Sequence, residues 1–169
     1  IHSDPRQVVE RHLAATRTID ASATPLDLVV WPENVIDVAD FSRSREINEV
    51  AQQANRLGAP FLVGVTEDVD SESFTNAQVV VDASAQVLDR YDKVRRVPFG
   101  EYMPMRGFLR SLGAPVDLVP RDAVAGTGPA VVAVPSKGTG NGQQFGVTGA
   151  ERRVAVVISA MFFSLLISS

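Results

Sequence analysis

The sequence contains no cysteine and only two histidines, and these absences exclude several kinds of chemistry. A chain of 169 residues without cysteine has no disulfide, no thiolate metal ligand and no thiol nucleophile of its own. Both histidines, His2 and His12, lie near the beginning of the sequence, so neither a histidine metal site nor a Ser-His-Asp triad is expected. We therefore predict a protein that holds no metal and needs no cofactor.

Long apolar runs and an excess of positive charge are absent as well. The longest mostly apolar stretch, residues 154–167, is interrupted by two serines and is shorter than the roughly 20 residues of a membrane-spanning helix. The net charge of −4 provides no basic face for nucleic acid and no basic cluster for an anionic membrane surface. With 45% hydrophobic and 21% charged residues, the composition indicates one globular domain, which we place over residues 1–169.

Apolar spacing and capping residues predict two helices near the beginning of the chain. Asp4 can cap a helix whose first turn contains Pro5 and which continues to about Ile19. A second helix is expected to begin after a serine at position 42 or 44 and to end at Gly58.

Short apolar runs predict strands, and two of them form a hairpin around residues 82–85. The expected strands cover residues 27–31, 60–66, 77–81, 86–91, 131–134 and 153–158. Residues 67–73 read as an acidic loop, and residues 105–112 as a short helix. Helices and strands alternate at first and strands then come in pairs, which favours an α/β fold built of layers.

Glu33 is the first candidate for catalysis, in the loop that begins Trp31-Pro32-Glu33-Asn34 after a strand-like run. Folds of the α/β class bind ligands at the carboxyl ends of their strands, and a half-buried carboxylate there can act as a general base. The alternative is a loop glutamate that caps a helix or pairs with an arginine. Position alone favours this alternative, since a single glutamate on a loop is weak evidence for catalysis.

Lys93 and Glu101 are the next candidates. Lys93 follows the strand-like run that ends at Tyr91, and a partly buried ammonium can stabilise an oxyanion; the alternative is a surface lysine. Glu101 lies in a loop of sequence Val-Pro-Phe-Gly-Glu-Tyr-Met-Pro, residues 97–104, whose prolines and glycine predict a rigid connection. This carboxylate is either part of the site or a salt-bridge partner for a nearby arginine, namely Arg95, Arg96 or Arg106.

Ser159 ends the last predicted strand, a position from which a hydroxyl can act as a nucleophile. No histidine lies near it in the sequence, so the alternative is a serine at a strand end without a catalytic role.

The segments W-P-E-N, Y-D-K and V-P-F-G-E-Y-M-P, in this order, resemble the bacterial apolipoprotein N-acyltransferases. These enzymes are a branch of the nitrilase, or carbon–nitrogen hydrolase, superfamily. Residues 58–64 and 74–77 fit as well, and the resemblance covers about residues 1–134. It implies a nitrilase-like α-β-β-α sandwich that is partial here, truncated at both ends, with the first strand and the C-terminal part missing.

The resemblance also implies roles for the candidate residues. The superfamily uses a Glu-Lys-Cys triad, so Glu33 would be the general base and Lys93 the lysine that stabilises the oxyanion, with Glu101, Tyr91 and Trp31 in support. In the family reaction a cysteine takes a fatty acyl chain from a phospholipid, and the amine of a lipoprotein's lipidated N-terminal cysteine then receives it. The parent protein is expected in the bacterial cell membrane, anchored by helices absent from this chain, with its catalytic domain on the extracytoplasmic side.

The sequence departs from this family at the nucleophile. Ser159 stands at the cysteine position, and Ala160-Met161 replaces the aromatic residue and glutamate that usually follow. We expect an aberrant tail over residues 159–169 and little or no acyltransferase activity, because a hydroxyl is much harder to deprotonate than a thiol. Two alternatives stay open: a generic carbon–nitrogen hydrolase acting on an amide or nitrile, and a non-catalytic remnant domain.

Overall fold

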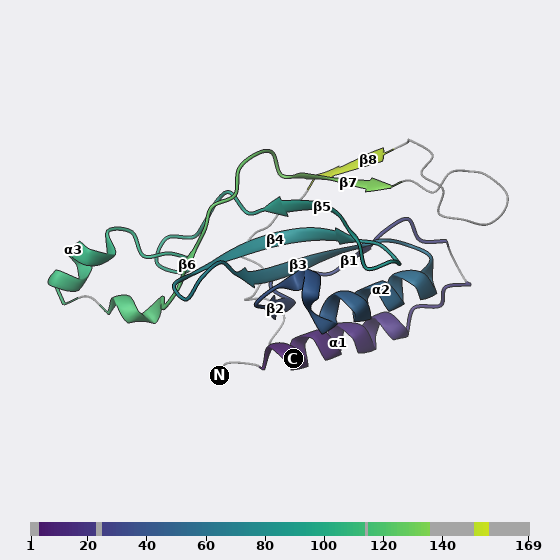
Figure 1. Cartoon of the computed structure of the whole chain (residues 1–169), viewed down its shortest axis with the longest axis horizontal. Coiled ribbons are helices and arrows are strands. Elements are labelled where there is room, and N and C mark those ends of the chain that lie inside the picture. Colours follow the sequence, from purple (N-terminus) through teal and green to yellow (C-terminus); the bar gives the residue numbers. More distant parts are fainter. Residues whose placement is uncertain (1–3, 23–24, 114, 136–150, 156–169) are drawn as a thin grey trace, which may run out of the picture.

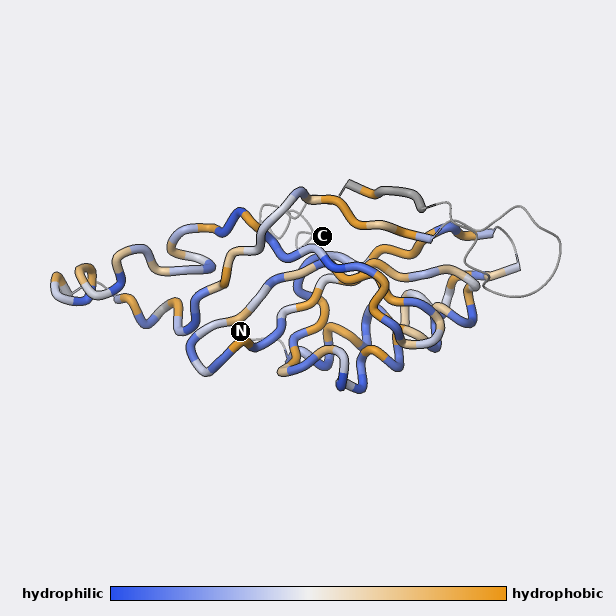
Figure 2. Tube along the Cα trace, turned by 45° about the horizontal axis from the view of Figure 1, so that its top comes forward, coloured by the Kyte–Doolittle hydropathy of each residue, from blue (hydrophilic) through white to orange (hydrophobic). Residues whose placement is uncertain are grey.

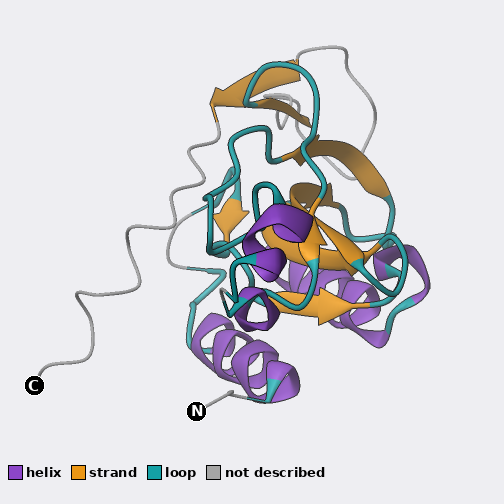
Figure 3. Ribbon diagram, turned by 90° about the vertical axis from the view of Figure 1, so that its left-hand side faces the viewer, coloured by secondary structure: helices purple, strands orange, loops and turns teal. Residues whose placement is uncertain are grey.

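The fold has three layers in the order helix, sheet, sheet. The computed structural model describes residues 4–22, 25–113, 115–135 and 151–155. Two helices, α1 (Pro5–Arg17) and α2 (Arg45–Leu57), cover one face of a six-stranded sheet (Figure 1). A two-stranded sheet lies on the side of the main sheet away from these helices (Figure 3).

Both long helices begin at residues that the sequence predicts as caps. The side chain of Asp4 accepts a hydrogen bond from a backbone N–H in the first turn of α1 (3.0 Å). Ser44 caps α2 in the same way (3.2 Å). The chain leaves α2 through Gly58, which adopts the left-handed conformation (φ 59°) that glycine tolerates best.

A buried apolar core joins the two helices to the main sheet. Its inner strands are β3 (Phe61–Asp68) and β4 (Ser73–Val81), which pair antiparallel over residues 61–68 and 74–81. Hydrophobic positions concentrate along these strands and on the helix sides that face them (Figure 2). The fully buried members include Leu13, Val50, Ala54, Phe61, Val63, Val65, Ala77 and Val79.

The remaining strands extend the main sheet in both directions. β5 (Val87–Asp92) pairs antiparallel with β4 and completes the predicted hairpin. On its other edge, β3 receives two short parallel strands in succession, β1 (Val29–Val30) and β2 (Ile36–Val38). The edge of the sheet is therefore interrupted between residues 31 and 35, where the predicted loop leaves it.

The second sheet consists of β7 (Val131–Pro135) and β8 (Glu151–Ala155), which pair antiparallel. Val132 and Val134 of β7 form a second buried cluster with Leu62 of β3 and Val80 of β4. The space between the two sheets is thus apolar at this end. The predicted layered α/β class is confirmed.

Several predicted boundaries need correction. Residues 36–38, expected in a loop, form β2, and the acidic loop is shorter than predicted because β3 continues to Asp68. β6 (Asp122–Ala123), which the sequence does not predict, pairs with the first residues of β4. Strands of two or three residues are too short to show the alternation on which such predictions depend.

The later elements agree with the sequence as far as they are described. The expected short helix forms as α3 (Arg106–Ser111). Residues 156–158 of the last predicted strand lie outside the described residues. None of the described helices is long and apolar enough to cross a membrane.

An ion-pair cluster between the two long helices makes stability depend on pH. Arg6 of α1 donates to both carboxylate oxygens of Glu49 on α2 (2.5 and 2.7 Å). This hydrogen bond lowers the pKa of Glu49, against the opposing effect of burial. A group whose pKa is lowered by folding stabilises the protein above its ordinary pKa, and that contribution is lost as the pH falls through the folded value.

We predict that Arg6→Ala lowers the free energy of unfolding by about 1–2 kcal/mol at pH 7, because a charge-assisted hydrogen bond is lost. The difference from the unaltered protein should shrink below the ordinary glutamate pKa of 4.5. Urea unfolding at pH 7 and at pH 3 measures both quantities. The control is Arg43→Ala, since Arg43 pairs with Asp40 but is 88% exposed, and its loss should cost less than about 0.5 kcal/mol. Equal losses in both variants would contradict the assignment.

Candidate active site

Lys93 lies at the centre of the candidate site and is almost completely buried, with 5% of its surface exposed. Its Nζ donates hydrogen bonds to Glu33 Oε1 (2.8 Å) and to Glu101 Oε1 (2.6 Å). The two glutamate side chains are themselves 14% and 15% exposed. The structure therefore brings together the three charged residues that the sequence singles out. A surface lysine, and glutamates paired with arginines, are excluded by this geometry.

The two carboxylates decide the charge of the lysine. Burial by itself lowers the pKa of Lys93, but hydrogen bonds to Glu101 and Glu33, together with their negative charges, outweigh burial. The pKa of Lys93 is raised above its ordinary value of 10.5, so the side chain is an ammonium at neutral pH. With all three groups ionised, one ammonium faces two carboxylates. One negative charge is left over, and a carboxylate with such a charge can accept a proton.

The interruption between β1 and β2 positions Glu33. β1 pairs with the beginning of β3 and β2 with its end, so the turn that carries Glu33 crosses β3 at Gly64. Asn34 in this turn has a left-handed backbone (φ 58°), and its side-chain oxygen accepts a hydrogen bond from the Thr66 hydroxyl (3.1 Å). Glu33 thus follows the carboxyl end of β1, as predicted, and its turn lies against β3 at Gly64.

Gly64 allows the turn to rest directly on β3. A Cβ at this position would lie 2.2 Å from the carbonyl oxygen of Pro32 and 2.7 Å from the Cα of Glu33. No other residue fits without moving the turn. A glycine inside a strand often marks such a close backbone approach, so this signal is available in the sequence.

A tight turn positions Glu101. The backbone N–H of Glu101 donates to the carbonyl of Val97 (2.8 Å), and Phe99 adopts a left-handed backbone (φ 63°). That conformation costs a residue other than glycine about 1–2 kcal/mol. Glu101 Oε2 accepts a hydrogen bond from the Val97 N–H (2.8 Å), while Oε1 accepts from Lys93. Both oxygens of Glu101 are therefore occupied, and its carboxylate is fixed.

Asn76 and Gly126, which are not among the candidate residues predicted from the sequence, hold the site together. Asn76 Nδ2 donates to Glu33 Oε1 (2.6 Å), and the Asn76 carbonyl accepts from the Lys93 N–H (2.8 Å). Gly126 donates its N–H to the Lys93 carbonyl (3.0 Å), and a Cβ there would lie 2.1 Å from the Asp92 carbonyl oxygen. Two local features of the sequence mark Asn76: it is a polar residue in an apolar strand, and it lies within residues 74–77, which fit the family resemblance. No local pattern marks Gly126.

Neither Trp31 nor Tyr91 makes a hydrogen bond to the described charged residues of the site, and Ser159 lies outside the described residues. Trp31 is buried in the core under α1, where its Nε1 donates to the Thr16 hydroxyl (3.1 Å). Tyr91 packs in the cluster between the two sheets, and its hydroxyl accepts from the Val94 N–H (3.4 Å). Any support that they give to the site is therefore indirect, through the segments that carry Glu33 and Lys93.

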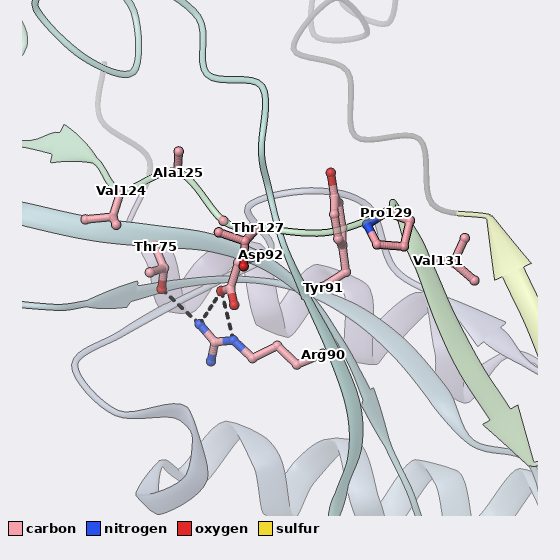
Figure 4. Close-up of a pocket in the computed structure, with 10 residues that line it drawn as sticks. Thr75, Arg90, Tyr91, Asp92, Val124, Ala125, Thr127, Pro129 and Val131 are labelled. Carbon is pink, nitrogen blue, oxygen red and sulfur yellow. Dashed lines mark hydrogen bonds and ion pairs between the residues drawn. The ribbon is translucent and has the colours of Figure 1, made fainter.

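A pocket of about 380 Å³ lies beside β5 but is not the charged site. It is lined by residues of β4, β5 and segment 124–131 (Figure 4). Arg90 in its wall is already bound to Glu67, Asp92 and Thr75. None of the three charged residues of the site lines it.

Fold and charged cluster together define the class of protein. Buried carboxylates can transfer protons, and a neighbouring ammonium can stabilise negative charge on oxygen. Such a combination of groups on an α/β fold is typical of an enzyme. The family model of the carbon–nitrogen hydrolases matches residues 2–151, and the chain belongs to this family.

Curated relatives support the acyltransferase branch. An apolipoprotein N-acyltransferase from Pseudomonas aeruginosa is 31% identical over 128 residues, which cover 73% of this chain and 24% of that protein. The enzyme of the same name from Mycolicibacterium smegmatis is 33% identical over 138 residues, which cover 75% of this chain and 23% of that protein. The resemblance drawn from the motifs is confirmed. The chain spans about a quarter of the length of these relatives.

Solved structures confirm the predicted nitrilase-like fold. A carbon–nitrogen hydrolase superfamily protein from Xanthomonas campestris matches with a TM-score of 0.52 at 19% identity, over 80% of this chain and 45% of that one. An N-terminal amidase matches with a TM-score of 0.52 at 12% identity, over 89% of this chain and 34% of that one. The partial coverage of both agrees with the predicted partial sandwich.

We predict that Gly64→Ala destabilises the protein by roughly 1–3 kcal/mol, because its Cβ overlaps the backbone of the turn that carries Glu33. The matched control is Gly107→Ala in α3, where a Cβ meets nothing within 4 Å and should be neutral or slightly stabilising. Urea unfolding of the two variants measures the difference. Similar stabilities would mean that the turn does not rest on Gly64.

We predict that Lys93→Met destabilises the protein by roughly 3–5 kcal/mol at pH 7, because two buried carboxylates lose their shared cation. Folding raises the pKa of Lys93, so its contribution is complete below pH 10.5 and is lost as the pH rises through the higher folded value. Urea unfolding at pH 7 and above pH 10.5 checks both points. Adding Glu33→Gln and Glu101→Gln to Lys93→Met removes the unpaired charges and should restore part of the stability. A triple variant less stable than Lys93→Met contradicts this account.

Proposed function

We propose that the chain is part of the catalytic domain of an N-acyltransferase of bacterial lipoprotein maturation. Its reaction would move a fatty acyl chain from a phospholipid to the N-terminal amine of a lipidated cysteine. The observation that carries the proposal is the buried ammonium of Lys93, held between the carboxylates of Glu33 and Glu101. Relatives that are 31% and 33% identical to this chain over the matched residues are named apolipoprotein N-acyltransferase.

Glu33 is the general base in this proposal. Its Oε1 accepts from Lys93 and Asn76, and among the described residues nothing donates to its Oε2. Glu101 accepts one hydrogen bond on each of its oxygens, and its role in this proposal is to hold the lysine in place. Glu33 would take the proton of the attacking nucleophile, and later that of the attacking amine.

Lys93 stabilises the oxyanion in this proposal. Attack on an ester or thioester carbonyl places a negative charge on oxygen, and an ammonium in a site shielded from water stabilises it strongly. Loss of one such donor typically costs about 10²–10³ in rate. The two glutamates keep the ammonium charged and in place before the substrate arrives.

The surface next to the site suits a lipid substrate. The segment around Glu101, residues 99–112, exposes large apolar side chains: Phe99 is 63% exposed, Met105 72% and Leu112 66%. Apolar side chains grouped at a surface are typical of contacts with lipid or another apolar ligand. We therefore propose that the parent protein acts at the bacterial cell membrane, with this domain on the extracytoplasmic side.

The chain as it stands is proposed to be inactive in acyl transfer. Position 159 carries a hydroxyl where the reaction needs a nucleophile that ionises easily. A thiol has a pKa of about 8.5, whereas a hydroxyl needs a much stronger base than a carboxylate. Ser159→Cys supplies the missing thiol.

The test incubates the chain with phospholipid vesicles and a diacylglyceryl-modified lipopeptide. We predict no acylated lipopeptide from the unaltered chain. Ser159→Cys should gain an acyl thioester on residue 159, visible by intact mass and removed by hydroxylamine, and should pass the acyl chain to the lipopeptide. Ser159→Ala is the control and should gain neither.

Every different outcome contradicts a specific part of the proposal. Product from the unaltered chain would show that the inactivity is wrong. A Ser159→Cys protein that ignores the vesicles but hydrolyses a small amide would favour a generic carbon–nitrogen hydrolase. A protein with neither activity would favour a non-catalytic remnant. Glu33→Gln added to Ser159→Cys should slow adduct formation about 10²-fold or more if Glu33 is the base.

A further inference from the structure

Asn76 links the two halves of the charged site with two different groups. It lies on β4 and is 3% exposed. Its backbone carbonyl accepts the N–H of Lys93 (2.8 Å), and its side-chain Nδ2 donates to Glu33 Oε1 (2.6 Å). One residue therefore joins the strand end that carries the ammonium to the turn that carries the carboxylate.

The Asn76 amide donates a hydrogen bond to Glu33 through its nitrogen, and its own oxygen is left without a hydrogen bond among the described residues. An ionised carboxylate only accepts hydrogen bonds, so the amide must present its nitrogen to Glu33. Asn76 Oδ1 is then buried and has no hydrogen-bond partner among the described residues. A buried acceptor without a partner costs about 1–3 kcal/mol. Packing alone would favour an apolar side chain here, so the bond to Glu33 is what the asparagine contributes.

Two donors on one oxygen restrict how the Glu33 carboxylate can turn. Lys93 Nζ and Asn76 Nδ2 both donate to Oε1, which leaves Oε2 without a donor in the described part of the chain. We propose that Asn76 is a positioning residue, whose amide holds Glu33 so that Oε2 stays free to take a proton from the nucleophile. This inference rests on the proposed role of Glu33 as the base.

Gln78 provides a matched control on the same strand. It lies two residues beyond Asn76, so its side chain is on the same face of β4, and it is 5% exposed. Its Oε1 also lacks a partner among the described residues. It makes no hydrogen bond to Glu33 or Lys93, both of which are described. Asn76→Ala and Gln78→Ala each remove one buried carboxamide, but only the first removes a bond to the site.

The first readout is spectroscopic and needs no activity. The sequence has two lysines, so Lys137→Arg leaves Lys93 as the only side-chain ammonium. In protein labelled with ¹⁵N-lysine, the Lys93 ammonium should give a slowly exchanging signal, since it is buried between two acceptors. We expect Asn76→Ala to speed its hydrogen exchange, because Glu33 is released and water reaches the ammonium. We expect Gln78→Ala to leave the exchange unchanged.

The outcomes separate positioning from general packing. Slow exchange in both variants, or fast exchange in both, would overturn the proposal, because Asn76 would then act no differently from Gln78. Circular dichroism establishes that each variant is folded. If Asn76→Ala does not fold, Asn76→Leu and Gln78→Leu fill the volume and give the same comparison.

The second readout uses the Ser159→Cys protein. Asn76→Ala in that background should slow formation of the acyl thioester by about tenfold to a hundredfold relative to Gln78→Ala, since misplacing a reacting group costs up to about 10²-fold. Equal rates in the two variants would overturn the positioning role. If Ser159→Cys itself forms no adduct, the proposed function fails, and the exchange measurement still tests the positioning of Glu33.

Discussion

The site depends on one interaction, the pair of hydrogen bonds from the Lys93 ammonium to Glu33 and Glu101. A lysine with 5% of its surface exposed would ordinarily lose its charge, because burial disfavours the ionised form. Two carboxylates reverse that tendency and leave one surplus negative charge in the cluster. The proposed proton acceptance and oxyanion stabilisation both depend on this cluster, and removal of the cation would leave the two carboxylates without their shared ion-pair partner.

Close contacts between backbone segments hold the residues of this interaction in position. The turn that carries Glu33 fits into an interruption between β1 and β2 only because Gly64 has no side chain. The end of β5 that carries Lys93 is held from the other side by Gly126, which also has no room for a Cβ. Asn76 bridges the two from the strand between them. The layers make the scaffold rigid. The close backbone contacts place Lys93 Nζ 2.8 Å from Glu33 Oε1 and 2.6 Å from Glu101 Oε1.

Local signals could predict the helices but only part of the site. Asp4, Ser44 and Gly58 mark helix ends because capping acts within one turn of chain. Glu33 and Lys93 could be named because each follows an apolar run within a recognisable motif. Their contact could not be derived, because it depends on the register of β3, β4 and β5. β2 was not predicted because it is only three residues long and pairs with a strand that is distant in the sequence.

The most direct test of the central interaction is a titration of Lys93 itself. In Lys137→Arg protein labelled with ¹³C-lysine, the side-chain carbon next to Nζ reports the ionisation of Lys93 alone. The account predicts a single midpoint above the ordinary lysine value of 10.5, because both carboxylates stabilise the ammonium. A midpoint at or below that value would mean that burial prevails, and that the ammonium is not held by Glu33 and Glu101.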